Sequence, residues 1–107
     1  PEGLKSSQEY YERALTLDPI HVGARIELSH IYEKDLLSLD RALKLIEDGA
    51  KYRYGTAKAL DLYLRQARLY GKVGEDDKRD QAMAKMLSFQ SRLDRSRAKQ
   101  EDGFSPF

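Results

Sequence analysis

The sequence lacks cysteine and tryptophan altogether, and it has only three prolines in 107 residues. Without cysteine, the chain has no disulfide, no thiol-based catalytic site and no zinc site that needs thiolate ligands. No apolar run approaches the roughly 20 residues that span a bilayer, and no signal peptide is visible. These absences lead us to expect an intracellular, cytoplasmic protein with no membrane span.

Recognisable catalytic patterns are missing too. No Ser/His/Asp set stands out, no carboxylate pair lies among apolar residues, and neither common phosphate-binding glycine motif is present. The residues 71–74, Gly-Lys-Val-Gly, have the spacing of an RNA-clamping loop, but that fold needs flanking strands, so we interpret them as a helix end. His30 and Glu33 have the spacing of two metal ligands on a helix, yet two ligands do not make a site. We therefore expect no enzyme activity, no metal and no cofactor.

The composition favours helices. Hydrophobic residues make up 40% and charged residues 35% of the chain, which predicts one soluble domain with a modest core. Long stretches consist of Ala, Leu, Glu, Lys, Arg and Gln, which are good helix formers, and strand-like alternation of useful length is absent. The sequence therefore predicts an all-α fold of five helices.

Caps, prolines and apolar periodicity set the expected bounds of these helices. The bounds are Ser6 or Ser7 to Leu17, Pro19 or Ile20 to Lys34, Ser38 to Lys51, Thr56 to Tyr70, and 75–102, with 103–107 as a flexible tail. The last helix has an apolar stripe at Ala82, Met83, Met86, Leu87, Phe89 and Leu93. Gly49 lies inside the third helix at a cost of about 1 kcal/mol relative to Ala, which indicates close packing.

One segment has the pattern of a known repeat. Tyr11–Pro19 reads Y-x-x-A-L-x-L-D-P, which resembles the end of the second helix of a tetratricopeptide repeat (TPR). In that family the aromatic and small residues pack two helices together, and the proline marks the junction with the next repeat. The next helix matches at Leu28, Ser29 and Tyr32, while Arg25 stands where a bulky aromatic residue is usual.

Two whole repeats match loosely. Ala42 and Ile46 stand at small and bulky positions, and Gly49 replaces the usual alanine. A third copy is fainter, with Gln66 in place of a large apolar residue and with Tyr70 placed 38 residues after Tyr32, where the family period is 34. The positions that the resemblance assigns to packing between helices are Tyr11, Ala14, Pro19, Leu28, Tyr32, Ala42, Ile46, Tyr63, Ala67 and Tyr70.

The resemblance implies antiparallel helix pairs stacked as a short right-handed TPR-like solenoid with a C-terminal capping helix. Residues 1–102 form one domain, divided into a half-repeat (6–19), two repeats (20–54 and 55–93) and a cap extension (94–102). The half-repeat lacks its own first helix, so we expect further repeats upstream or from another chain. The alternative is an unrelated five-helix bundle in which the motif is accidental.

The resemblance also implies a scaffold or adaptor that binds a peptide or partner helix in a concave groove. The groove residues are Gly23, Ile26, Glu27, His30, Glu33, Lys34, Asp61, Leu64, Arg65, Arg68 and Lys72. Ile26 and His30 stand where some TPR proteins use Lys and Asn to clamp a carboxylate, so that function is not transferred. The opposing charges favour a ligand of mixed charge, and replacing Arg65 and Arg68 with Glu is expected to weaken binding without unfolding.

A nucleic-acid-binding domain is the alternative function. Residues 1–55 have eight basic and ten acidic side chains, whereas residues 56–107 have eleven and eight. Arg92, Arg95, Arg97 and Lys99 carry much of this excess on the last helix, where they would bind phosphates. The pI of about 8.5 is mild, so we interpret this run as a solvated face. We interpret Ser105-Pro106-Phe107 as a loose end; the alternative is a C-terminal peptide ligand for another protein.

Overall fold

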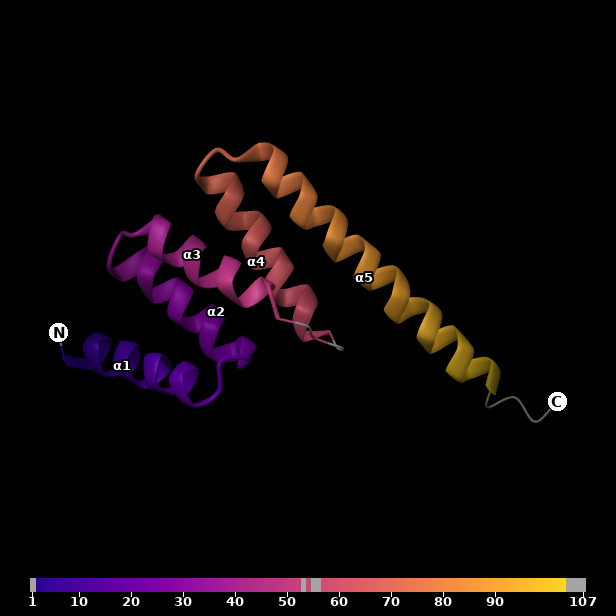
Figure 1. Cartoon of the computed structure of the whole chain (residues 1–107), viewed down its shortest axis with the longest axis horizontal. Helices are drawn as coiled ribbons and strands as arrows, with labels where there is room; N and C mark the ends of the chain where they lie inside the picture. Colours follow the sequence, from indigo (N-terminus) through magenta and orange to yellow (C-terminus); the bar gives the residue numbers. More distant parts are fainter. Residues whose placement is uncertain (1, 53, 55–56, 104–107) are drawn as a thin grey trace.

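The structure is a computed structural model that describes residues 2–52, 54 and 57–103, with side chains for 6–52, 54 and 57–98. Its elements are α1 (Glu2–Leu17), α2 (Val22–His30), the π-helical turn η1 (Ile31–Asp35) that continues α2, α3 (Leu39–Ala50), α4 (Lys58–Lys72) and α5 (Asp76–Gly103). All regular structure in these residues is helical, which confirms the predicted all-α class of five helices. Consecutive helices run in opposite directions, and α5 extends well beyond the N-terminal end of α4 (Figure 1).

The start of α2 differs from the prediction. It begins at Val22 rather than at Pro19 or Ile20, and His21 is its N-cap. The His21 Nδ1 accepts a hydrogen bond from the Ala24 amide at 3.0 Å. Because this bond satisfies a free amide of the first turn, the helix begins after the histidine and leaves Pro19 and Ile20 exposed in the turn.

Other predicted helix ends also shift. α1 starts at Glu2, so Ser6 lies inside the helix and is not the expected cap. Ser38 does precede α3, but its side chain makes no capping hydrogen bond. Gly103 belongs to α5 and not to a tail, while Thr56 and residues 104–107 lie outside the described residues.

The π-helical turn η1 brings Tyr32 into the core. The Leu36 amide donates to the Ile31 carbonyl at 3.1 Å, the wider ring of a π turn. Tyr32 is buried, and its hydroxyl donates to Glu12 Oε1 of α1 at 3.1 Å. Burial and this hydrogen bond raise the pKa of Tyr32 above its ordinary value. The turn therefore ties α1 to the end of α2.

The hydrophobic core lies between α2, α3 and α4. Its buried members are Val22, Leu28, Tyr32, Ala42, Ile46, Leu62 and Leu69. A smaller cluster of Ala67, Tyr70 and Ala82 joins α4 to α5. Six of the ten residues assigned to packing are buried, namely Leu28, Tyr32, Ala42, Ile46, Ala67 and Tyr70. Tyr11, Ala14 and Tyr63 are half-buried, and Pro19 is exposed.

Close packing at Gly49 has a specific cause. The Arg25 side chain of α2 is buried against this glycine of α3, and a Cβ added to Gly49 would lie 2.2 Å from Arg25 Cδ. The guanidinium is held there, since Nη1 donates to the Leu45 carbonyl at 2.9 Å and Nη2 to the Pro19 carbonyl at 2.6 Å. The glycine predicted to mark a close approach therefore makes room for an arginine.

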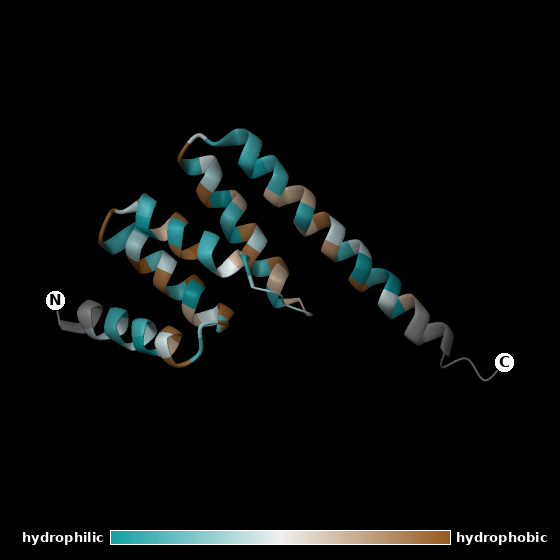
Figure 2. Cartoon of the chain, in the orientation of Figure 1, coloured by the Kyte–Doolittle hydropathy of each residue, from teal (hydrophilic) through white to brown (hydrophobic). Residues whose placement is uncertain are grey.

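α5 buries little of its surface. Ala82 is buried and Met86, Phe89 and Leu93 are half-buried, but Met83 and Leu87 of the predicted stripe are exposed. Leu17 at the end of α1 is exposed as well. Figure 2 shows that the first turns of α5 are hydrophilic. In the described part of the chain, no helix combines the length and the apolar character needed to cross a membrane.

Candidate functional site

α2 and α4 lie side by side and enclose a surface pocket of about 350 Å³. The residues that line it come in pairs 38 positions apart in the sequence. They are Gly23, Ile26, Glu27 and His30 of α2 and Asp61, Leu64, Arg65 and Arg68 of α4. We call this pocket the α2/α4 groove.

Of the eleven residues predicted for the groove, the structure brings together Gly23 and seven others. The seven are Ile26, Glu27, His30, Asp61, Leu64, Arg65 and Arg68. Glu33 and Lys72 do not line it, but they lie beside Arg65 in a polar network. Lys34 is exposed and lines none of the pockets that we describe.

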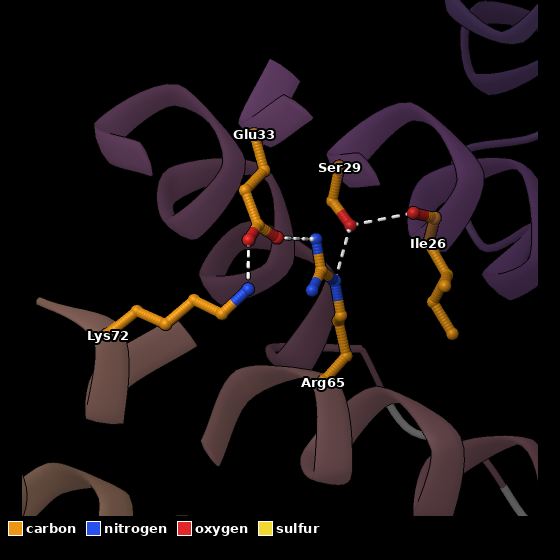
Figure 3. A network of polar contacts seen from close by, with 5 residues as sticks. All are labelled: Ile26, Ser29, Glu33, Arg65 and Lys72. Carbon is orange, nitrogen blue, oxygen red and sulfur yellow. Dashed lines mark hydrogen bonds and ion pairs between the residues drawn. The ribbon is translucent and has the colours of Figure 1, made fainter. Parts of the chain in front are cut away.

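An ion pair holds the two helices together beside the groove (Figure 3). Arg65 Nη2 lies 2.7 Å from Glu33 Oε1, and the two side chains are only 7% and 10% exposed. Arg65 Nε donates to Ser29 Oγ at 2.9 Å, and the same hydroxyl donates to the Ile26 carbonyl at 2.6 Å. Lys72 Nζ contacts the second oxygen of Glu33. Each oxygen of the carboxylate thus has a cationic partner.

These contacts stabilise the charged form of Glu33. The hydrogen bond from Lys72 and the contacts with Arg65 lower the pKa of Glu33, against the opposing effect of burial. Glu33 and Arg65 were expected to offer opposite charges to a ligand. In the structure they neutralise each other, so their charge is used within the chain, and replacing Arg65 with Glu would put two carboxylates together in a buried place. Of the two arginines, only Arg68 can be replaced with Glu to test ligand binding without disturbing a buried ion pair.

His30 is half-buried in the groove, next to Arg65. Burial and the charge of Arg65 lower the pKa of its imidazole below the ordinary value, so the ring is neutral at neutral pH. Its Nδ1 is buried and has no hydrogen-bond partner among the described residues. Glu33, the other half of the pair with metal-ligand spacing, is occupied by Arg65 and Lys72. In the part of the chain that the structure describes, no three His, Asp or Glu side chains are grouped to hold a metal ion.

Three charged residues of the α2/α4 groove remain available. Glu27, Asp61 and Arg68 are exposed, and no ion pair with another described residue involves them. Half-buried Ile26 and Leu64 form apolar walls between them. The groove therefore offers apolar and charged side chains next to one another.

Two features of this region escaped the sequence reasoning. Ser29 was assigned only as a small packing residue, yet its hydroxyl links Arg65 to the Ile26 carbonyl. Arg25 was noted only as a departure from the repeat pattern, yet it bonds to two carbonyls across the α2–α3 interface. The sequence did contain a signal for this contact: an arginine, Arg25, at a position expected to be buried, and a glycine, Gly49, in the middle of the next helix.

A second depression, of about 250 Å³, lies between α4 and α5. Tyr63, Lys85, Ser88, Phe89 and Arg92 line it. The Tyr63 and Phe89 ring centroids are 5.6 Å apart, and the Arg92 guanidinium lies 5.5 Å from the Phe89 centroid. The last helix thus combines aromatic and basic side chains, which the sequence reasoning did not expect.

Comparison of the chain with protein-family models, with curated proteins and with solved structures gives no match. The geometry of the groove and of the last helix is therefore the basis for a functional proposal.

Proposed function

We propose that the chain is a short TPR-like solenoid that acts as a non-enzymatic scaffold or adaptor and binds a peptide or partner helix in the α2/α4 groove. One observation supports this above all. Seven residues chosen from a repeat pattern meet around one pocket of about 350 Å³, although they come from two helices that are 38 residues apart.

The groove has the properties that peptide recognition needs. Ile26 and Leu64 supply apolar contact area, and Glu27, Asp61 and Arg68 supply charges that orient a ligand. All of these side chains stand on helices rather than on loops, and the buried Arg65–Glu33 pair holds α2 against α4. A rigid, preformed site loses less conformational entropy when it binds.

The proposal includes stacking on further repeats or on another chain of a multiprotein assembly. The two ends of the helix array expose large apolar side chains, namely Tyr10, Leu17 and Ile20 near α1 and Met83 and Leu87 on α5. Each repeat of a solenoid covers the apolar face of its neighbour.

Peptide selection tests the groove directly. The full chain is used to select binders from a phage-displayed library of random 12-residue peptides, and the affinity of synthetic copies is measured by fluorescence anisotropy. Arg68→Glu should weaken binding about tenfold, since a groove charge is reversed. Arg95→Glu reverses an exposed charge on α5 and should leave the affinity unchanged. The proposal fails if Arg68→Glu and Arg95→Glu bind as wild type.

Nucleic-acid binding by α5 is the second candidate, favoured by the basic and aromatic depression. Lys78, Lys85 and Arg92 are seven residues apart on one side of α5, and no ion pair joins them to a described carboxylate. Under this alternative, a fluorescent single-stranded oligonucleotide binds with an affinity that falls steeply with salt, and Arg92→Glu abolishes it. A peptide complex that Arg68→Glu disrupts and nuclease leaves intact favours the groove.

A further inference from the structure

We infer that the α2/α4 groove selects an extended peptide in which a basic and an acidic side chain are three residues apart. The basic side chain contacts Asp61, and the acidic side chain contacts Arg68. This inference rests on the proposed function, because it describes the ligand of the same groove.

The first step is to separate charges used within the chain from charges open to a ligand. Arg65, Glu33 and Lys72 contact one another, and the first two are almost fully buried. The neutral imidazole of His30 adds no charge. Two carboxylates, Glu27 and Asp61, and one guanidinium, Arg68, are left exposed in the groove.

The second step is their order along the groove. Asp61 and Arg68 stand on the same face of α4, seven residues and therefore about 10.5 Å apart along the helix axis. On α2, Gly23 and His30 line the same groove with the same seven-residue spacing. Asp61 thus lies toward one end of the groove and Arg68 toward the other, while Glu27 lies on α2 between Gly23 and His30. A ligand with the complementary order gains attraction at both ends.

The third step converts this distance into a peptide spacing. An extended chain rises about 3.3 Å per residue, so about 10 Å corresponds to three residues. Ile26 and Leu64 lie between the charged positions and suit the aliphatic stem of a lysine or arginine whose charged end reaches Asp61. Gly23 has no side chain, so it leaves room in the groove.

The test is an exchange of charges between groove and peptide. A peptide with lysine and glutamate three residues apart is taken from the 12-residue library. It is then made with two lysines, with two glutamates, and with the charges seven residues apart. Wild type should bind the first peptide about tenfold more tightly than the other three. Arg68→Glu should prefer the two-lysine peptide, and Asp61→Lys the two-glutamate peptide. Because charges are changed both in the groove and in the peptide, the expected exchange of preference does not depend on the direction in which the peptide binds.

Two controls separate the possible failures. Arg95→Glu should keep the wild-type order of preference, and thermal melts should show that each variant is folded. Equal binding of all four peptides, or preferences that the groove variants do not exchange, overturns the charge order. Tighter binding at seven-residue spacing overturns the extended ligand, because that spacing suits a helix. If Leu64→Gln also leaves binding intact, the peptide is not in the groove, and the proposed function fails with it.

Discussion

Arg25 and Gly49 depend on each other across the α2–α3 interface. Arg25 occupies a position where the TPR pattern expects an aromatic side chain, and Gly49 one where it expects alanine. The longer arginine fits because the glycine leaves its Cβ position empty. The two departures from the pattern are therefore one compensated change in the α2–α3 interface.

Gly49→Ala should destabilise the fold by about 1–3 kcal/mol, because the new Cβ would overlap Arg25 Cδ and displace a guanidinium held by two carbonyls. This is opposite to the gain of about 1 kcal/mol expected from helix propensity alone. The free energy of unfolding in urea measures the effect.

Two controls accompany this variant. Gly71→Ala in α4 meets only Arg79 Cδ, at an ordinary 3.5 Å, so it should be neutral or slightly stabilising. In an Arg25→Ala background the cost of Gly49→Ala should disappear, as a double-mutant cycle will show. An equal cost in both backgrounds would contradict the coupling.

Glu33 should make stability depend on acid pH. Its folded pKa is lowered by Lys72 and Arg65, so it contributes stability above the ordinary glutamate pKa of about 4.3, and that contribution is lost as the pH falls through the lower folded pKa. Glu33→Gln should lose about 2 kcal/mol at pH 7 because Arg65 is left buried without its charge partner. The difference from wild type should shrink as the pH falls from 7 to values below the ordinary glutamate pKa of about 4.3. Urea unfolding across this range measures it, and a constant difference would exclude the linkage.

At the scale of elements, the end of the second helix carries local strain. The π turn η1 is followed by Leu37, which has a φ of 50° and is 85% exposed. A leucine in the left-handed region is disfavoured by about 1–2 kcal/mol, and its exposed side chain contributes little packing in return. The next residue returns to η1, since the Ser38 amide donates to the Tyr32 carbonyl at 2.7 Å.

Leu37→Gly should therefore stabilise the protein by about 0.5–1 kcal/mol, since glycine adopts positive φ without a steric cost. Leu36→Gly is the matched control, because Leu36 has a φ of −101° and gains nothing from glycine. We expect the thermal midpoint to rise for the first variant and to fall or stay for the second. The reverse order would mean that Leu37 packs in solution.

At the scale of the whole molecule, stability should be highest at the centre of the helix array. The core joins α2, α3 and α4, whereas α5 packs chiefly on α4 through one buried side chain, Ala82, and the half-buried stripe. The molecule measures 61 × 32 × 20 Å, so much of its length consists of helix with a neighbour on one side only. Terminal units of such arrays open more easily than central ones.

Hydrogen–deuterium exchange should reveal this gradient. Amides of α2, α3 and α4 should exchange slowest, those of α1 faster, and those of α5 after Leu93, where residues 94–98 are exposed, fastest. Mass spectrometry of peptic fragments measures the order. Uniform protection along the chain would contradict it.

The sequence determined the fold class and most of the composition of the candidate site. Helical periodicity is a local property and was enough to predict the fold class, whereas the seven side chains that meet in one groove were selected through the resemblance to the repeat pattern. Helix ends were less predictable, because several neighbouring residues can each act as the N-cap of a helix. The imidazole of His21, which was not considered as a cap, sets the start of α2 in place of Pro19.

Only the tertiary structure decided which charges the groove presents. Glu33 and Arg65 look like exposed groove charges in the sequence, yet they are 32 residues apart and become partners only when α2 and α4 pack. The same packing removes their charge from the surface and leaves Glu27, Asp61 and Arg68 open. Periodicity states which face of a helix a residue occupies, whereas pairing and burial depend on what the neighbouring helix places opposite it.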